Sequence, residues 1–306
     1  MTDPVISPDG KWMWTGSEWI PAPPAAEPVS VSMQDSVIAG DVNITQNNAE
    51  DIAAAMVTAL ERIGFSGQSS PIELTPSQEA EVEQVLEMSE QLAGHGIEID
   101  PWTEITLGNA AKLAGRTHSA LQHYLRALES FRQNGDRGGE ADSLNTLGLI
   151  AQTRGDLDEA DRLQRESLVI KREIGDRQGE AASLNNLGEI ARHRGDLYEA
   201  ERLQRESLAM NREIGNRQGE ANSLNNLGLI AQTRGELAEA ERLYQESLAM
   251  NREIGNRAHE ANALLLLGDL ANHDDEETAA LYYTEAVKIL READLIVPQV
   301  LIDAGF

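Results

Sequence analysis

The sequence predicts an all-α fold, a right-handed superhelical solenoid of helix-turn-helix units. The first observation is that near-identical text restarts every 40 residues, at Gly139, Gly179 and Gly219. Repeats of this length are typical of stacked helical arrays. The second observation is that apolar and small residues within each copy follow the helical spacing of about 3.6 residues instead of the alternation of a strand. In the copy that begins at Gly139 this spacing occurs twice. The first run is Leu144, Leu147, Gly148 and Ala151, and the second is Ala160, Leu163, Ser167, Ile170 and Ile174.

Turn-forming residues separate the predicted helices. Gly155 can end the first helix of a unit in a left-handed conformation, and Asp156 can cap the helix that follows. Gly175 and Asp176 repeat this arrangement before the next unit. The register extends in both directions, although in the last unit Asp275 replaces the turn glycine and the pattern resumes one residue early. The sequence therefore predicts an array over residues 99–294 with five units, 99–138, 139–178, 179–218, 219–258 and 259–294.

The repeated pattern resembles the tetratricopeptide repeat, through Leu144, Leu147-Gly148, Ala160 and Ser167. The unit exceeds that family's usual length of about 34 residues, because its second helix is longer. In this respect the chain is similar to kinesin light chains and to adaptors that regulate heterotrimeric G proteins. It lacks most of the aromatic residues and the closing proline of the usual pattern. The resemblance implies a protein-interaction adaptor or scaffold, whose first helices line a concave groove.

The residues before the array predict several small elements. Residues 1–21 contain the turn formers Asp9-Gly10 and Gly16 and predict a β-hairpin. Three of the four tryptophans of the chain, Trp12, Trp14 and Trp19, lie within eight residues of each other there. An exposed cluster of such rings indicates a docking surface, although the rings could also pack on one another or on the array. The stretch resembles short Trp-rich segments of prokaryotic proteins.

Further along, composition predicts a Pro-rich linker at 22–28, a short strand-helix element at 29–65, a second linker at 66–74 and a capping helix at 75–98. Residues 295–306 form a C-terminal tail. The strand-helix element has an apolar helix face from Ile52 to Ile63, and two lone strands are marginally stable in water. Copies of the chain that associate through residues 29–65 would stabilise this element, so we expect a homo-oligomer there. The alternative is that the strand-helix element packs on the array of the same chain.

Composition argues against an enzyme. The chain has no cysteine, which excludes disulfides, thiolate nucleophiles and zinc-thiolate sites. No two of its six histidines have the i, i+4 spacing of a helical zinc site, and there is no phosphate loop, dinucleotide fingerprint or nucleophile elbow. We expect a non-catalytic protein with no catalytic residues, no metal and no cofactor; an enzyme with a site at the junction of the two halves is less expected.

Charge narrows the class of partner. The formal net charge is −27, with 17 acidic and 2 basic residues in positions 1–100 and 10 acidic and 2 basic residues in positions 259–306. Such acidic ends disfavour binding to nucleic acid or to an anionic membrane. Nothing at the amino terminus resembles a signal peptide, and no stretch approaches about 18 apolar residues. We expect a cytoplasmic acidic protein whose partner is a protein or peptide.

The face opposite the buried stripe of each first helix is the candidate binding surface. The repeat places like residues in ladders there, and amide side chains offer both a donor and an acceptor to a peptide backbone. Incomplete divergence of duplicated units would also explain the asparagines, and pairing with acids across the turn would explain the arginines. A further alternative is a regulatory sensor that binds a small anionic ligand or phosphopeptide at Arg192, Arg194 and Arg234. The predicted groove residues are Asn145, Asn185, Asn186, Asn225, Asn226, Gln152, Arg192, Gln232, Arg194 and Arg234.

Overall fold

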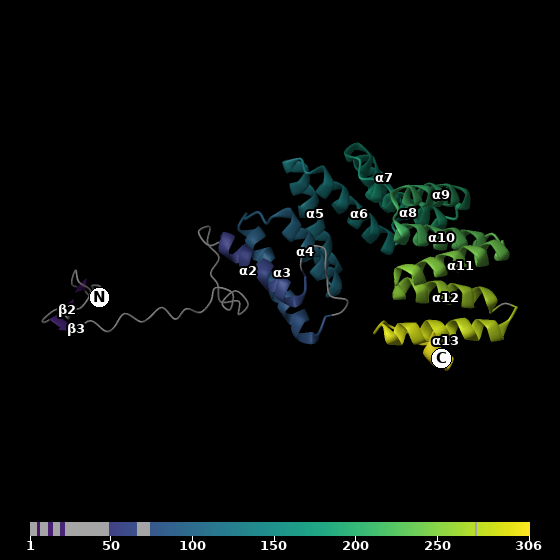
Figure 1. Ribbon diagram of the computed structural model, residues 1–306. Helices are drawn as coiled ribbons and strands as arrows, with labels where there is room; N and C mark the ends of the chain where they lie inside the picture. Colours follow the sequence, from purple (N-terminus) through teal and green to yellow (C-terminus); the bar gives the residue numbers. More distant parts are fainter. Residues whose placement is uncertain (1–4, 7–11, 15–18, 22–48, 66–73, 273) are drawn as a thin grey trace. The chain divides into compact units, whose positions relative to one another are not determined.

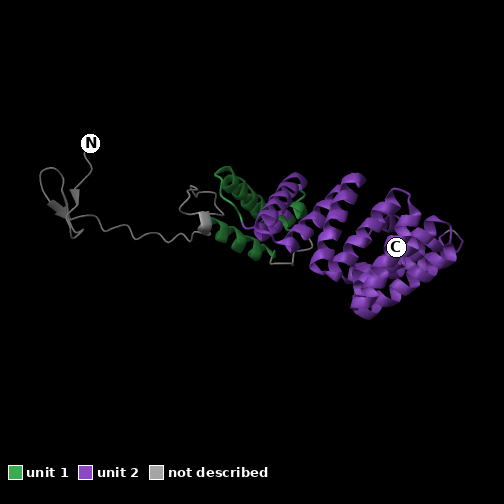
Figure 2. Cartoon of the chain, turned by 90° about the horizontal axis from the view of Figure 1, so that it is seen from above, with its two compact units in different colours: residues 1–99, 109–116 green, residues 100–108, 117–306 purple. Residues whose placement is uncertain are grey.

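The computed structural model describes residues 5–6, 12–14, 19–21, 49–65, 74–272 and 274–306. The chain divides into two compact units, coloured separately in Figure 2. Unit 1 comprises residues 1–99 and 109–116, and unit 2 comprises residues 100–108 and 117–306. The repeats with the strict 40-residue period all belong to unit 2.

Three short strands are described near the amino terminus. They are β1 (Val5–Ile6), β2 (Trp12–Trp14) and β3 (Trp19–Pro21), paired antiparallel in that order. Met13 lies opposite Ile6 on one side and Ile20 on the other. The intervening turns lie outside the described residues, and so do the linker at 22–28 and the strands expected before residue 46. The hairpin and the docking role of its tryptophans therefore remain predictions.

Unit 1 contains helices α2 (Ala49–Ile63) and α3 (Pro76–Gly94), which contact each other. Thr75 begins α3 with a capping box, in which its hydroxyl accepts from the backbone N–H of Gln78 and the Gln78 side chain accepts from the backbone N–H of Thr75. The apolar face expected on α2 is buried. Its members Ile52, Met56, Leu60 and Ile63 are each at most 3% exposed.

The array is all-helical, as the sequence predicts, and successive helices from α6 onward lie side by side in Figure 1. From α5 to α13, each helix contacts the next one along the chain, both within a repeat and between repeats. Residues 100–108 and 109–116 belong to different compact units, so α4 (Pro101–Leu113) contributes to both. The helices that follow it in the described residues are α5 (Thr117–Asn134), α6 (Arg137–Thr153), α7 (Leu157–Ile174), α8 (Arg177–His193), α9 (Leu197–Ile214), α10 (Arg217–Thr233), α11 (Leu237–Ile254), α12 (Arg257–Ala271), α13 (Glu276–Glu292) and α14 (Gln299–Asp303).

The turns confirm the expected chemistry. Gly155 and Gly175 have φ values of 80° and 73°, a left-handed conformation that glycine adopts without a Cβ penalty. Asp156 caps α7 by accepting a hydrogen bond from the backbone N–H of Glu159 at 3.2 Å. Asp275 likewise caps α13. None of the described helices is long and apolar enough to cross a membrane.

Small residues set how closely the two helices of a unit approach. A Cβ added at Gly188 in α8 would lie 2.7 Å from Nε2 of Gln204 in α9. In α10 the corresponding glycine, Gly228, instead meets the ring of Tyr244, which is fully buried. Glycine at this position is therefore a packing residue that admits the side chain of the second helix.

Candidate functional site

The polar face expected on the first helices is present on α6, α8 and α10. Because successive residues of a helix are about 100° apart, Leu144 and Leu147 lie on one side of α6 and Asn145 and Gln152 lie on the other. The leucines are buried, whereas the two amide side chains are partly exposed. We call the partly exposed set the amide row. It comprises Asn145, Gln152, Asn185, Asn186, Asn225, Asn226 and Gln232.

Asparagines of the amide row bond to one another across unit boundaries. Nδ2 of Asn186 donates to Oδ1 of Asn145 at 2.9 Å, and Nδ2 of Asn226 donates to Oδ1 of Asn185 at 3.0 Å. Sequence reasoning treated these residues as ligand-binding groups or remnants of duplication and missed this structural role. The signal was available, because two adjacent asparagines per unit allow one to reach back to the preceding unit.

A hollow of about 370 Å³ opens at the α8–α10–α12 end of the row. Glu189 accepts from Nδ2 of Asn226 at 3.1 Å within it. Partial burial of the His259 ring lowers its pKa below the ordinary value of 6.5, which favours the neutral imidazole at pH 7. The surface therefore combines neutral hydrogen-bonding groups with one carboxylate. The lining residues are Asn185, Glu189, Asn222, Asn225, Asn226, Ala258, His259 and Asn262.

Asn222 and Asn262 were not predicted, because an amide occupies this position of the repeat only in the last two units. Asn222 corresponds to Asp142 in the earlier unit, and Asn262 lies in the last, degenerate unit. Nδ2 of Asn225 donates to Oδ1 of Asn262 at 3.0 Å. The Oδ1 atom of Asn225 is itself buried and has no hydrogen-bond partner among the described residues.

The other predicted amides and Arg192 have different surroundings. Oε1 of Gln232 accepts from the hydroxyl of Tyr244 at 2.8 Å, whereas Oε1 of Gln152 is buried and has no partner in the described part of the chain. Arg192 contacts Nε2 of His193 through Nη2 at 2.8 Å. Its Nε atom is buried and finds no partner among the residues described.

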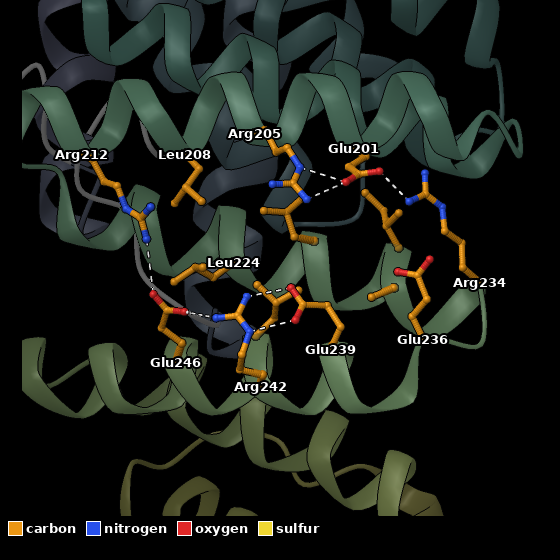
Figure 3. A pocket seen from close by; sticks show the side chains of 14 residues that line it. Glu201, Arg205, Leu208, Arg212, Leu224, Arg234, Glu236, Glu239, Arg242 and Glu246 are labelled. Atoms are coloured by element: carbon orange, nitrogen blue, oxygen red, sulfur yellow. Dashed lines mark hydrogen bonds and ion pairs between the residues drawn. The ribbon is translucent and has the colours of Figure 1, made fainter.

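The structure places Arg194 and Arg234 in ion pairs with the preceding unit. Arg194 Nη2 lies 2.5 Å from Oδ1 of Asp158. Arg234 Nη1 lies 2.5 Å from Oε2 of Glu201, and its Nη2 donates to the carbonyl of Leu197 at 2.9 Å. Figure 3 shows Arg234 in a hollow between α9 and α11, on the side of α10 that carries Leu224. Both arginines are thus paired with acidic residues of this chain. The hollow that Arg234 lines shares no residue with the hollow at the amide row.

Paired helices that recur every 40 residues and share a polar face define a helical-repeat solenoid. The family model described as Tetratricopeptide repeat matches residues 100–173, 179–253 and 219–292. Since these matches span more than half of the sequence, the chain belongs to the tetratricopeptide repeat family. Within the described residues, no group of three or more histidine, aspartate or glutamate side chains is arranged to hold a metal ion.

Solved structures share this fold. BtubC (BKLC) from P. vanneervenii is 21% identical, with a TM-score of 0.56 over 72% of this chain and 93% of that one. A putative kinesin light chain from Podosopora anserina is 14% identical, with a TM-score of 0.50 over 63% and 95%. The Rap conjugation gene regulator of plasmid pLS20, solved with the Phr* peptide, is 12% identical, with a TM-score of 0.59 over 84% and 67%. These identities establish similarity of fold alone. No curated protein matches the chain.

Proposed function

We propose that this protein is a non-catalytic adaptor that binds a partner peptide or helix along the amide row. The observation that carries the proposal is the Oδ1 atom of Asn225, which is buried without a partner among the described residues beside an open hollow. An unsatisfied buried acceptor costs about 1–3 kcal/mol, and a backbone N–H of a bound peptide would recover that cost.

The chemistry of the surface supports a peptide as the ligand. Its amides supply donors and acceptors, which match the backbone of a polypeptide. Glu189 adds one negative charge near the centre and favours a segment with a donor or a cation at that point. The fold neighbour solved with the Phr* peptide has a peptide as its bound partner, which supports the same ligand class here.

The test is recovery of a partner from source lysate, read by mass spectrometry. We would compare the wild-type chain with a variant carrying N145A, N185A and N225A. A matched control would carry E173A, E213A and E253A, three equivalent exposed residues on the second helices. A partner recovered by the wild type and the control but lost by the asparagine variant, with helicity unchanged by circular dichroism, is the expected result. Equal recovery by all three chains would refute binding at the row.

A regulatory sensor of a small anionic ligand or phosphopeptide is the second candidate. It is favoured by the Nε atom of Arg192, a buried donor without a partner in the described structure. Inorganic phosphate and a phosphoserine peptide should then raise the melting temperature of the wild type but not that of R192A. The R194A variant serves as the control, because Arg194 already pairs with Asp158.

Association through residues 29–65 also remains a proposal. The apolar face of α2 is already buried, so the association would have to use other residues of this segment. Light scattering should give the mass of a multimer for the full chain. A chain that begins at residue 46 should give the mass of its monomer. A monomeric mass for the full chain would exclude this role.

A further inference from the structure

An apolar groove lies between α5 and α7, on the side of α6 that faces away from the amide row. It encloses about 370 Å³, and Leu125 on its edge is 47% exposed. Leu147, which forms part of its lining, lies about 160° from Asn145 around α6, because successive helical residues are about 100° apart. Its apolar lining includes Leu121, Leu125, Leu128 and Leu163, and Arg154 also lines it. We call this hollow the α5–α7 groove.

The equivalent hollow two units later is polar. Between α9 and α11 it encloses about 230 Å³, and Glu201 is bound there by two arginines (Figure 3). Glu201 lies 2.7 Å from Nη2 of Arg205 and 2.5 Å from Nη1 of Arg234. At the boundary between α7 and α9, Asp161 pairs with Arg165 at 2.7 Å and lies 3.6 Å from Arg194. An acidic residue of the preceding unit therefore neutralises the recurring arginine at both boundaries.

The α5–α7 groove keeps the recurring arginine but loses its acid. Arg154 is the counterpart of Arg194 and Arg234, whereas the positions of Glu201 and Arg205 hold Leu121 and Leu125. The guanidinium of Arg154 makes no hydrogen bond or ion pair with any residue in the described part of the chain, and only its backbone N–H is bonded, to the carbonyl of Ile150. Two changes in one unit thus replace an ion-pair network with leucines and leave one guanidinium unpaired.

The other charged groups that line the groove are already engaged. Arg132 binds Glu140 at 2.9 Å and also contacts Glu166. Arg162 binds Glu159 at 2.6 Å and Glu166 at 3.1 Å. The carboxylate of Asp156 caps α7. Among the charged residues that line the groove, Arg154 is therefore the one whose side chain can pair with a ligand. A guanidinium binds a carboxylate through two parallel hydrogen bonds.

We propose that the α5–α7 groove is a second binding surface, which takes a partner segment with aliphatic side chains next to an aspartate or glutamate. The aliphatic groups would cover Leu121 and Leu125, and the carboxylate would occupy the place that Glu201 fills in the later unit. This complementarity of charge and apolar surface is independent of the amide row, so either surface can be disproved without the other.

The probe is a peptide selected from a displayed library of random 12-residue sequences on the immobilised full chain. Counter-selection would use the L121E/L125R variant, which rebuilds in this groove the acid and arginine found at Glu201 and Arg205. The expected consensus contains aliphatic residues beside Asp or Glu. A synthetic peptide of that sequence should bind the wild type at least about tenfold more tightly than it binds R154A or L121E/L125R.

Controls separate this surface from the amide row and from loss of folding. R234A removes the same arginine from the α9–α11 hollow and should bind the peptide like the wild type, as should N145A/N185A/N225A. Melting of L121E/L125R should match the wild type, because both leucines are partly exposed. A consensus without a carboxylate, no consensus at all, or unchanged binding to L121E/L125R would overturn the proposal. Self-association of the wild type that L121E/L125R abolishes would also overturn it, in favour of a second copy of the chain.

Discussion

Nε of Arg212, near the end of α9, donates to Oε1 of Glu220, at the start of α10, at 2.7 Å. Glu220 is 6% exposed, and its second oxygen accepts from Nη1 of Arg217 at 3.0 Å. Nη2 of Arg212 reaches on to Glu246 in α11 at 3.3 Å. The buried glutamate thus joins one unit to the next. Its equivalents Glu140, Glu180 and Glu260 are buried with two arginine partners each.

We expect E220A to destabilise the array by about 1–3 kcal/mol. It removes the buried carboxylate that accepts two charge-assisted hydrogen bonds. Urea unfolding followed by circular dichroism measures the change. E239A is the matched control, since Glu239 makes an exposed pair with Arg242 within one helix and such pairs contribute about 0–1 kcal/mol. Equal losses in the two variants would contradict a structural role for the buried glutamate.

The glycine that follows leucine in the first helix of each repeat meets a different side chain in different repeats. Its replacement by alanine should therefore cost a different amount of stability in each. We expect G228A to destabilise by about 1–3 kcal/mol, because the new methyl group would clash with the buried ring of Tyr244. In G148A the nearest group is the flexible amide of Gln164, 2.8 Å away, and the better helix propensity of alanine offsets part of the cost. Thermal melting should therefore show a smaller loss for G148A, and the opposite order would refute this account of the packing.

Glu201 predicts a dependence of stability on pH. Hydrogen bonds from Arg234 and Arg205 lower the pKa of Glu201 below its ordinary value of 4.5. Because the folded pKa lies below the unfolded one, the stabilisation is complete above the unfolded pKa and disappears as pH falls through the folded pKa. E201Q should cost about 1 kcal/mol at pH 7, and the difference from the wild type should shrink below pH 4.5. Urea titrations at several pH values measure it, and a constant difference down to pH 3 would disprove the link.

The bonds between asparagines predict that N226A weakens the contact between units. It removes the donor that binds Oδ1 of Asn185 and Glu189. A loss of about 0.5–1.5 kcal/mol is expected for a hydrogen bond of this kind. N145A, which removes only the acceptor of Asn186, should cost no more than N226A. Hydrogen exchange of α8 and α10 amides would detect the loosening, and unchanged exchange in N226A would argue that these bonds contribute nothing.

The local pattern of the sequence was sufficient to predict the helices and their turns. The 3.6-residue spacing of Leu144, Leu147 and Ala151 depends only on the geometry of one helix, and Gly155 and Asp156 end and begin helices through their own backbone preferences and capping. The predicted polar face followed from the same geometry, because Asn145 lies opposite Leu147.

The partners of the polar side chains were decided by tertiary structure. Asn186 bonds to Asn145, and Arg234 to Glu201, over separations of 41 and 33 residues, and such contacts depend on how one unit stacks on the next. The same stacking leaves Arg154 without the acid that its equivalents have. The sequence by itself determined which residues form each helix and which side of it is buried. Only the stacked structure decided which polar groups satisfy one another and which remain available to a partner, because that depends on distances between units that no local spacing specifies.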